Sequence, residues 1–568
     1  MKKIIKTLLL GFGCFLLSCE GDSLLEEKPL DFYTPDNSLE TVSQFQSSLN
    51  FLYNKIRDLN YGLTIDLDAF FALRYATDFA LNVTDYNPPA KLNDYKNTMT
   101  PTFSVPNNIW RSLYVIVTNA NVVIGRSELS TTLSETEKKD IQSQAYFFRA
   151  YAYNMLANLY GGVPLVLEEI QVPRRDFTRA TRKEVYLQAS QDLAHAIAGL
   201  NNVDEVGDGL VNKQVAQHLL TEVYISLEEY NLAVNTATDV INYPGLSLMT
   251  SRFGKRANLP GDVYRDLFDL NNQNRSSGNL EGLLVLQRDY QNPSSGTRFY
   301  SNAWSMLPDM LNLTIGSESA ILGYNEKWSS RGVGWMRPTD HFLNTIWQNG
   351  GNDIRNSEFN ILRDFQIDGV SPSSPAYGKW YVADGYAAQA QGINNQKRNW
   401  FPIIKKLTAS PGDFHQDVIR KDASGTPLES PFGGKLLENA SENLHIDIYL
   451  YRLAETYLLR AEAHIKNNDP GNAVNDINAL RSRAGAVLAT AGEMDLDYVL
   501  DERLRELYTE ELRTVTLTRM GKHYDRTSRF NEKSGLSIET YHNLWPIPFQ
   551  EIERNIEAKL EQNQGYDN

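Results

Sequence analysis

Aromatic residues able to stack on a flat apolar ligand gather in the middle of the chain. Six of the eight tryptophans stand there, namely Trp304, Trp328, Trp335, Trp347, Trp380 and Trp400. A sugar presents apolar ring faces edged by hydroxyl groups, so its binding site needs exposed aromatic platforms beside Asp, Asn, Gln or Arg side chains. Both kinds of side chain occur together between residues 300 and 335. We therefore expect ligand contacts from the following aromatic residues: Tyr300, Trp304, Tyr324, Trp328 and Trp335.

For any one of these rings, burial in a small core is the competing interpretation. The segment that holds Trp304, Trp328 and Trp335 shows no apolar stripe at helical spacing, unlike the surroundings of Trp110. These three rings are therefore less committed to a helical core. The hypothesis requires that two or three members of the cluster stack on a ligand.

Sequence motifs of hydrolytic or metal-dependent enzymes are absent. The chain has no HExxH pattern, no GxSxG nucleophile elbow and no paired cysteines for a metal. Residues 269–273 begin like a calcium-binding loop, but Asn274 stands where Gly is required and Leu280 where Glu is required. We therefore predict no catalytic residue, no metal site and no cofactor. Glycosidases use two carboxylates that only the fold brings together, so a surface-anchored glycan hydrolase remains the alternative.

The N-terminal residues predict a lipid anchor. Three lysines precede an apolar run over residues 7–17, which is too short to span a bilayer and is typical of a signal peptide. The residues that follow, LLSC at 16–19, resemble a bacterial lipobox, in which cleavage precedes the cysteine and the cysteine is acylated. We expect residues 1–18 to be removed and Cys19 to carry the lipid. Loss of Cys14 with the signal peptide leaves no second thiol for a disulfide.

The charge of the chain limits its partners. The formal net charge is −15, and removal of the three lysines in residues 1–18 lowers it to −18. Nucleic acid is an unsuitable partner, because binding to phosphates requires a basic surface. Electrostatic docking on anionic lipid is disfavoured for the same reason. Acyl chains on Cys19 would supply membrane attachment instead.

Helical pairs must position these residues. Between residues 447 and 485, apolar side chains recur at three- and four-residue steps, at Leu450, Leu453, Ala454, Tyr457, Ala461 and Ile465. Charged residues of the same stretch lie largely off that stripe: Arg452, Glu455, Arg460 and Glu462. Asp469 is a good N-cap and Pro470 suits the first position of a second helix. One pair cannot bury both apolar faces alone, so neighbouring pairs are required, as in a stacked helical repeat.

Similar signals mark the first part of the chain. We expect a helix over residues 39–59, with Val42, Phe45, Leu49 and Leu52 facing inward, followed by a loop-like stretch to residue 106. Capping boxes at Ser134 with Glu137 and at Thr181 with Glu184 predict two helix starts. Further helices are expected around residues 215–227 and 233–241.

These elements predict a mainly α fold. It is a degenerate tetratricopeptide-like scaffold of about four helix pairs, together with a loop-rich, irregular second subdomain. The composition becomes rich in Gly, Pro, Ser and Asn after residue 245, and so long a loop must form a subdomain of its own. The expected divisions are listed here: signal peptide 1–18, N-terminal helical scaffold with its tether 19–245, ligand-binding subdomain 246–445, and C-terminal repeats with a closing segment 446–568.

Several stretches together resemble the SusD/RagB family, the surface lipoproteins of nutrient uptake in Bacteroidetes. They are residues 110–124, 145–165 (AYFFRAYAYNMLANLYGGVPL), 337–339 followed by Asp353 and Arg355, 500–521, 545–548 (WPIP) and 562–566. They cover almost the whole chain in the expected order. The resemblance implies a non-catalytic protein that binds an oligosaccharide, or sometimes a peptide. It also implies a partner, a SusC-like TonB-dependent barrel transporter, on which the protein acts as a lid.

The same resemblance adds site residues and a location. The family also uses the loop between its first two helices, where Asp78 and Tyr86 stand here. That loop holds no Trp, unlike the loop of starch-binding members. Glu20 and Asp22 after Cys19 are similar to acidic surface-export signals, which implies the outer face of the outer membrane. The sequence therefore predicts a surface glycan-binding lipoprotein, with a glycan hydrolase or a peptide-binding RagB-type lipoprotein as alternatives.

Overall fold

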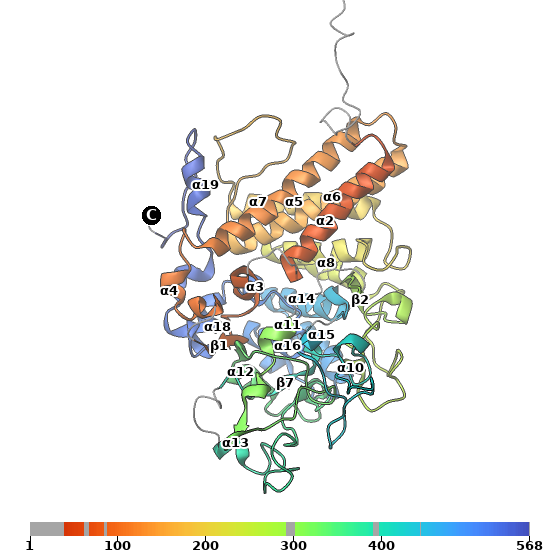
Figure 1. Cartoon of the computed structure of the whole chain (residues 1–568). Helices are drawn as coiled ribbons and strands as arrows, with labels where there is room; N and C mark the ends of the chain where they lie inside the picture. Colours follow the sequence, from red (N-terminus) through yellow and green to blue (C-terminus); the bar gives the residue numbers. More distant parts are fainter. Residues whose placement is uncertain are drawn as a thin grey trace, which may run out of the picture.

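The computed structural model describes residues 39–61, 67–84, 88–290, 302–389, 397–442 and 445–566 of the 568-residue chain. In Figure 1 long helices form one end of the molecule, shorter helices fill its middle, and loops with short elements form the other end. The prediction of a mainly α fold with a helical scaffold and an irregular region is confirmed. Among the described residues, no helix combines the length and the apolar character needed to cross a bilayer.

The first part of the chain supplies the long helices and two short ones. They are α2 (Val42–Tyr61), α3 (Leu67–Arg74), α4 (Tyr95–Thr98), α5 (Ser104–Leu129), α6 (Glu135–Tyr160), α7 (Arg182–Gly199), α8 (Lys213–Ser226) and α9 (Tyr230–Ile241). Both predicted capping boxes are present: the Glu137 N–H donates to Ser134 Oγ at 3.3 Å, and the Ser134 N–H donates back to Glu137 at 2.8 Å. The box of Thr181 starts α7 in the same way. α6 ends at Gly161, whose φ of +76° suits glycine.

The region between residues 246 and 445 is built of short elements. Its helices are α10 (Val263–Asp266), α11 (Asn302–Met306), α12 (Asp340–Leu343) and α13 (Tyr386–Gln389). Its strands are β2 (Gly282–Leu286), β3 (Thr314–Ile315), β4 (Glu318–Ser319), β5 (Met336–Pro338), β6 (Ile361–Leu362) and β7 (Ile403–Ile404). Four two-stranded antiparallel sheets occur in the described residues, pairing β1 (Ala80–Asn82) with β5, β2 with β8 (Ile448–Arg452), β3 with β4, and β6 with β7.

The C-terminal helices complete the scaffold that the first helices begin. They are α14 (Leu453–Lys466), α15 (Pro470–Arg483), α16 (Leu496–Leu507), α17 (Arg513–Arg519), α18 (His523–Phe530) and α19 (Phe549–Arg554). α14 packs against α15 and also against α8 and α9. Ile225, Ala233, Leu459 and Ala463 form one buried cluster across that contact. The helical stack is therefore continuous in space, although about two hundred residues separate its two parts in sequence.

Three sequence-based expectations are wrong in detail. Val42 was expected to face inward, but it is 44% exposed, because α2 turns Phe45, Leu49 and Leu52 toward the core instead. The stretch from residue 60 to 106 is not only loop: it holds α3, β1 and α4. Leu450 belongs to strand β8 rather than to the helix, because residues 448–452 pair with distant β2.

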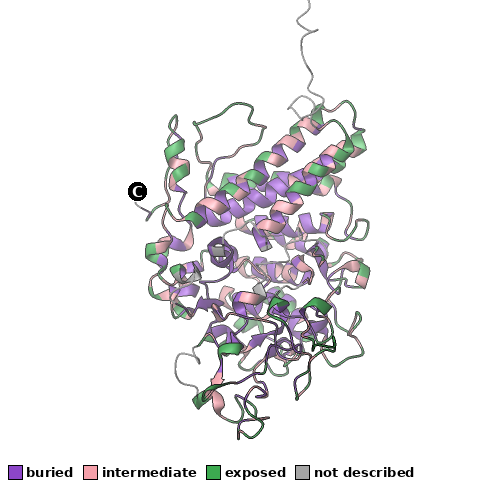
Figure 2. Cartoon of the chain, viewed as in Figure 1, coloured by how far each residue is buried: buried purple, intermediate pink, exposed green. Residues whose placement is uncertain are grey.

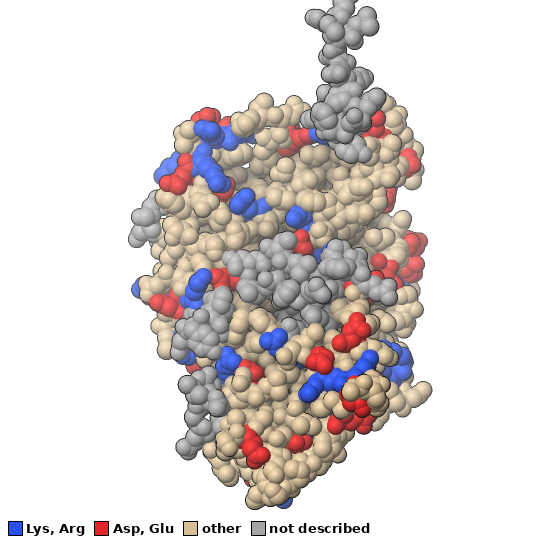
Figure 3. Space-filling view, viewed as in Figure 1, with Lys and Arg blue, Asp and Glu red and all other residues tan. Residues whose placement is uncertain are grey.

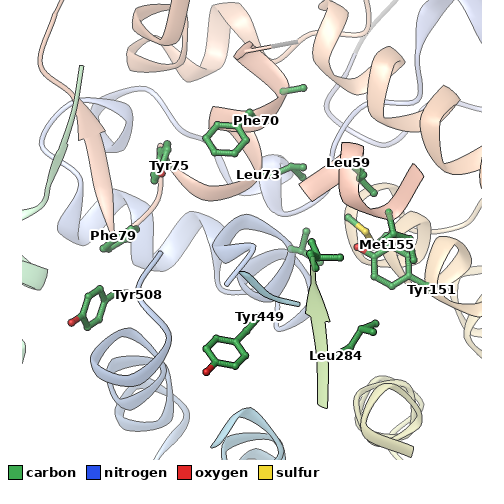
Figure 4. Close-up of a cluster of buried hydrophobic side chains, with 14 of the residues drawn as sticks. Leu59, Phe70, Leu73, Tyr75, Phe79, Tyr151, Met155, Leu284, Tyr449 and Tyr508 are labelled. Atoms are coloured by element: carbon green, nitrogen blue, oxygen red, sulfur yellow. The ribbon is translucent and has the colours of Figure 1, made fainter. Parts of the chain in front are cut away.

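The core lies where these parts meet. In Figure 2 the long helices are buried along the sides that face one another. Figure 4 shows part of the core, in which Leu59, Phe70 and Tyr151 from the first helices approach Leu284 of β2 and Tyr449 of β8. One contiguous apolar cluster thus joins the helices to the start of the irregular region.

A network of buried charges ties the irregular region to the C-terminal helices. Glu506 of α16 accepts hydrogen bonds from Arg355 at 3.1 Å, from Arg452 at 2.6 Å, and from Arg483. Burial by itself would raise the pKa of Glu506, but the guanidinium groups of Arg483, Arg452 and Arg355 hold it well below its usual range. Arg355 also binds Asp353 at 2.7 Å. Buried charges need partners of this kind, which explains charged residues at positions that periodicity assigns to the surface.

Candidate ligand-binding site

Two of the predicted platform residues form a pair. The rings of Trp304 and Trp335 lie 4.5 Å apart between centroids and 68° apart in plane, and both side chains are partly exposed. Trp304 belongs to α11, and Trp335 immediately precedes β5. This edge-to-face geometry is favourable for aromatic pairs and leaves part of each indole accessible.

Backbone hydrogen bonds hold this tryptophan pair in place. The Val333 N–H donates to the Trp304 carbonyl at 2.9 Å, and the Gly334 N–H donates to the Leu307 carbonyl at 2.8 Å. Gly334 has φ +59°, and a Cβ there would lie 2.0 Å from the Arg398 carbonyl oxygen. Only glycine fits that close approach, so the turn before Trp335 is fixed by the absence of a side chain.

A third, distant segment completes the surroundings of the pair. β5 pairs with β1, with Leu81 opposite Arg337, and the Val83 N–H donates to the Trp335 carbonyl at 3.1 Å. The segments 80–84, 302–307 and 333–338 therefore meet at one place. Participation of the loop between the first two helices in ligand binding stays a prediction. Tyr86 and Tyr300, which were predicted to belong to the site, lie outside the described residues, as does Cys19.

Asp78, which was predicted to contact the ligand, is buried and paired with arginines. Its carboxylate is fully buried and accepts hydrogen bonds from Arg513 at 2.7 and 2.9 Å and from Arg526 at 2.8 Å. Burial alone would raise the pKa of Asp78, but these two guanidinium groups hold it well below its usual range. The Asp78 carbonyl also accepts from the Thr339 hydroxyl at 2.6 Å. A surface ligand cannot reach this carboxylate, so Asp78 anchors β1 and β5 instead of contacting the ligand.

Tyr324 and Trp328 are likewise buried, contrary to the expectation that they form a platform. The Tyr324 hydroxyl donates to the Gly332 carbonyl at 2.9 Å. The Trp328 ring is covered by the Lys327 ammonium, 4.4 Å from its centroid, and by the ring of Trp380 at 6.2 Å. The cause is tertiary: this stretch folds back on itself and pairs with residue 436, so the rings pack into the core.

Trp380 is an exposed tryptophan that the predicted site did not include. The residue is 40% exposed, and its backbone N–H donates to the Asp384 carboxylate at 2.7 Å. The position of Trp380 in a polar, turn-rich stretch is a sequence signal for exposure, but Trp328 stands in a similar stretch and is buried. Composition therefore does not separate the two tryptophans.

The calcium-like sequence does not form a cation site. No group of three or more His, Cys, Asp or Glu side chains with the geometry for a metal occurs in the described part of the chain. Asp269, which opens the calcium-like sequence, is buried and paired with Arg265 at 3.0 Å and Arg256 at 3.6 Å. Two cations already neutralise the carboxylate that a calcium ion would need.

Comparison with known proteins places the chain in a family. The family model described as "SusD family" matches residues 433–566, and the model described as "Starch-binding associating with outer membrane" matches residues 30–225. SusD-like protein P25 of Formosa agariphila is 24% identical over 583 residues, covering 98% of this chain and 97% of that protein. The starch-binding protein SusD of Bacteroides thetaiotaomicron is 39% identical over 126 residues, covering 21% of this chain and 22% of that protein.

The fold agrees with these matches. Surface glycan-binding protein A of Bacteroides thetaiotaomicron, solved in complex with laminarihexaose, superposes with a TM-score of 0.64 at 17% identity, covering 92% of this chain and 99% of that one. The two family models match the two helical parts that pack into one scaffold, and the relative from Formosa extends the likeness along nearly the full length. The chain belongs to the SusD/RagB family.

Proposed function

We propose that this protein is a surface glycan-binding lipoprotein of the outer membrane. It captures oligosaccharides and delivers them to a TonB-dependent SusC-like transporter, over which it acts as a lid. The observation that carries the glycan-binding part is the partly exposed, rigidly held pair of Trp304 and Trp335.

The chemistry of the tryptophan pair suits a sugar chain. Two indoles whose planes lie 68° apart offer one apolar face and one edge, on which pyranose rings can stack without a charged partner. The neighbouring Arg337 binds Asp340 at 2.8 Å and lies 3.5 Å from Glu532, so polar side chains stand close to the platform. Such groups can hydrogen-bond sugar hydroxyls at the rim.

The relatives support the same class of ligand. One bears the name starch-binding protein, and one structural neighbour was solved with laminarihexaose. Both ligands are glucose polymers, so they are natural first probes for this chain.

Transport sets a second requirement, which is release. A protein that hands its cargo to a barrel must bind with modest affinity, and it must bind without cleaving the sugar chain. Acylation of Cys19 would keep it at the membrane surface beside that barrel. Recovery of a monomer alone from native membranes in mild detergent, without a large barrel companion, would contradict the lid model.

Calorimetry with maltohexaose and laminarihexaose tests the glycan site. Trp304→Ala and Trp335→Ala should each weaken binding by about tenfold or more, since loss of one stacking ring costs roughly 1–3 kcal/mol in the analogous case of bases on aromatic side chains. Trp380→Ala is the matched control, because it removes an exposed indole that makes no ring contact with the pair. Chromatography of each oligosaccharide after incubation with the parent should show the original chain length.

Two outcomes would contradict the proposal. Equal affinity of the parent, Trp304→Ala and Trp335→Ala for a glycan that does bind would show that the site lies elsewhere. Shortened oligosaccharides, produced by the parent and not by a heat-treated sample, would favour the hydrolase alternative.

A further inference from the structure

A cleft of about 460 Å³ lies on the helical side of the molecule. Its three walls are α5, the segment 164–177 that follows α6, and the end of the chain from α19 to Leu560. None of the residues that line it belongs to β1, α11 or β5, which carry the candidate glycan site. This volume is typical of sites for small molecules.

Hydrogen bonds between the walls show that this cleft is built into the fold. The Tyr114 hydroxyl of α5 donates to the Pro164 carbonyl at 2.7 Å. The Asn555 carboxamide accepts from the Phe177 N–H at 2.8 Å and donates to the Phe177 carbonyl at 2.7 Å. These bonds join the segment 164–177 to both other walls, so the cleft is formed without a ligand.

The lining of the cleft is mainly apolar. It includes Val115, Pro164, Val166, Ile170, Phe177 and Leu560. Three neutral polar side chains beside them are already engaged: the Tyr114 hydroxyl and the Asn555 carboxamide hold the walls, and the Asn119 carboxamide donates to the Val115 carbonyl at 2.8 Å. A sugar would leave several hydroxyl groups without partners here, which is unfavourable. An acyl or aryl body has no such requirement.

The lining of the cleft carries a net positive charge in a strongly acidic protein, because it holds four arginines and one glutamate, Glu551. Four arginines line it: Arg111, Arg174, Arg175 and Arg554. Two of them have a carboxylate partner, Asp176 at 2.9 Å and Glu551 at 3.2 Å. Within the described ranges, Arg111 and Arg175 have no carboxylate at ion-pair distance. In Figure 3 Lys and Arg side chains lie at this corner of the molecule, near α19 and the loop after α6, with Asp and Glu side chains among them. Both arginines are exposed, so their guanidinium groups are accessible to an anionic ligand in the cleft.

We propose that this cleft binds an amphiphilic carboxylate, a small molecule with one carboxylate and an apolar acyl or aryl body. The carboxylate accepts charge-assisted hydrogen bonds from Arg111 and Arg175, which are stronger than neutral ones. The apolar body covers Val115, Ile170 and Phe177, and its burial adds to the affinity in proportion to the area removed from water. The site is separate from the proposed glycan site and adds a second ligand class to the protein.

Titration calorimetry with octanoate tests this proposal directly. The parent should bind octanoate and should bind the neutral octanol at least about tenfold more weakly, because octanol cannot form the charge-assisted bonds. The double variant Arg111→Gln, Arg175→Gln should lose at least about tenfold in affinity for octanoate. Binding by the parent should also weaken as salt rises.

Two further variants separate the ligand site from general effects. Arg529→Gln removes an exposed arginine of α18 outside the cleft and should leave octanoate binding unchanged. Ile170→Asp keeps both unpaired arginines but places a carboxylate in the apolar wall; since Ile170 is exposed, folding should persist and binding should be lost. Absence of saturable octanoate binding by the parent, equal affinity for octanol, or unchanged binding by the folded double variant would each overturn the proposal.

Discussion

Replacement of Asp78 by Asn decides whether this carboxylate holds the fold or touches a ligand. The variant removes a buried negative charge and leaves the guanidinium groups of Arg513 and Arg526 in place. Loss of one partner from a buried ion pair costs about 3–5 kcal/mol. Arg513 keeps Glu511 at 3.1 Å and Arg526 keeps Asp501, so neither cation is left alone. We therefore expect the free energy of unfolding to fall by about 3–5 kcal/mol, and not by twice that amount although two arginines lose a partner.

Chemical unfolding measures this loss, and Asp340→Asn is the matched control. The Asp340 carboxylate is exposed and forms an ion pair with Arg337 at 2.8 Å. A surface ion pair contributes about 0–1 kcal/mol to stability. Glycan affinity of the folded Asp78→Asn variant is measured in parallel. Stability within about 0.5 kcal/mol of the parent, below the loss expected for a buried pair, would refute the structural role. Unchanged stability together with lost binding would restore Asp78 as a ligand contact.

The dependence on pH provides an independent check of the same reasoning. The folded protein holds the pKa of Asp78 below the unfolded value of about 3.9. The native state therefore binds this proton less readily, so the contribution of Asp78 is fully present above that unfolded value and is lost as pH falls toward the folded pKa. The stability difference between the parent and Asp78→Asn should be constant from pH 7 to pH 5 and shrink below about pH 4. A difference that grows on acidification would contradict the assigned ion pairs.

Three further predictions concern the scaffold, the core and the anchor. Ala461→Leu overpacks the fully buried face of α14 and should lower the free energy of unfolding by about 1–3 kcal/mol. The control Ala491→Leu, at an exposed position, should change it little. An unchanged melting temperature of Ala461→Leu would show that this face is not tightly packed. Trp328→Ala removes a buried ring and should cost about 3–5 kcal/mol of stability, whereas the partly exposed Trp335 should cost less when truncated; the reverse order in thermal melts would contradict the assigned burial. Cys19→Ala should release the protein from membranes in soluble form; a variant that still sediments with membranes and resists protease on intact cells would exclude the lipid anchor.

The sequence alone determines the parts of this protein that depend on nearby residues. The capping boxes of Ser134 and Thr181 and the N-cap of Asp469 before Pro470 appear in the structure as predicted. Each depends on groups within three or four residues, so a short window contains all the information. The order of the family motifs is equally a property of the sequence, and it is sufficient to indicate the family.

Only the tertiary structure decides the elements whose partners are distant in sequence. Residues 448–452 form a strand because β2 pairs with them across more than 160 residues, although their apolar spacing fits a helix. Arg452 and Glu462 stand off the apolar stripe and are nevertheless buried, because Glu506 and Arg519 neutralise them. A charge is stable inside a protein only beside its counter-charge, and the positions of the counter-charges are set by packing.

The candidate site shows the same division most clearly. Composition indicated a segment in which Trp304 and Trp335 are partly exposed, but it also included Tyr324 and Trp328, which the fold buries. All four rings stand in similar polar, glycine-containing surroundings, so local sequence cannot rank their exposure. Tyr324 and Trp328 are buried because residue 325 pairs with residue 436. Trp335 stays partly exposed because it precedes β5, which pairs with β1. Exposure of an aromatic ring is a property of what folds over it, and that depends on contacts between residues far apart in the chain.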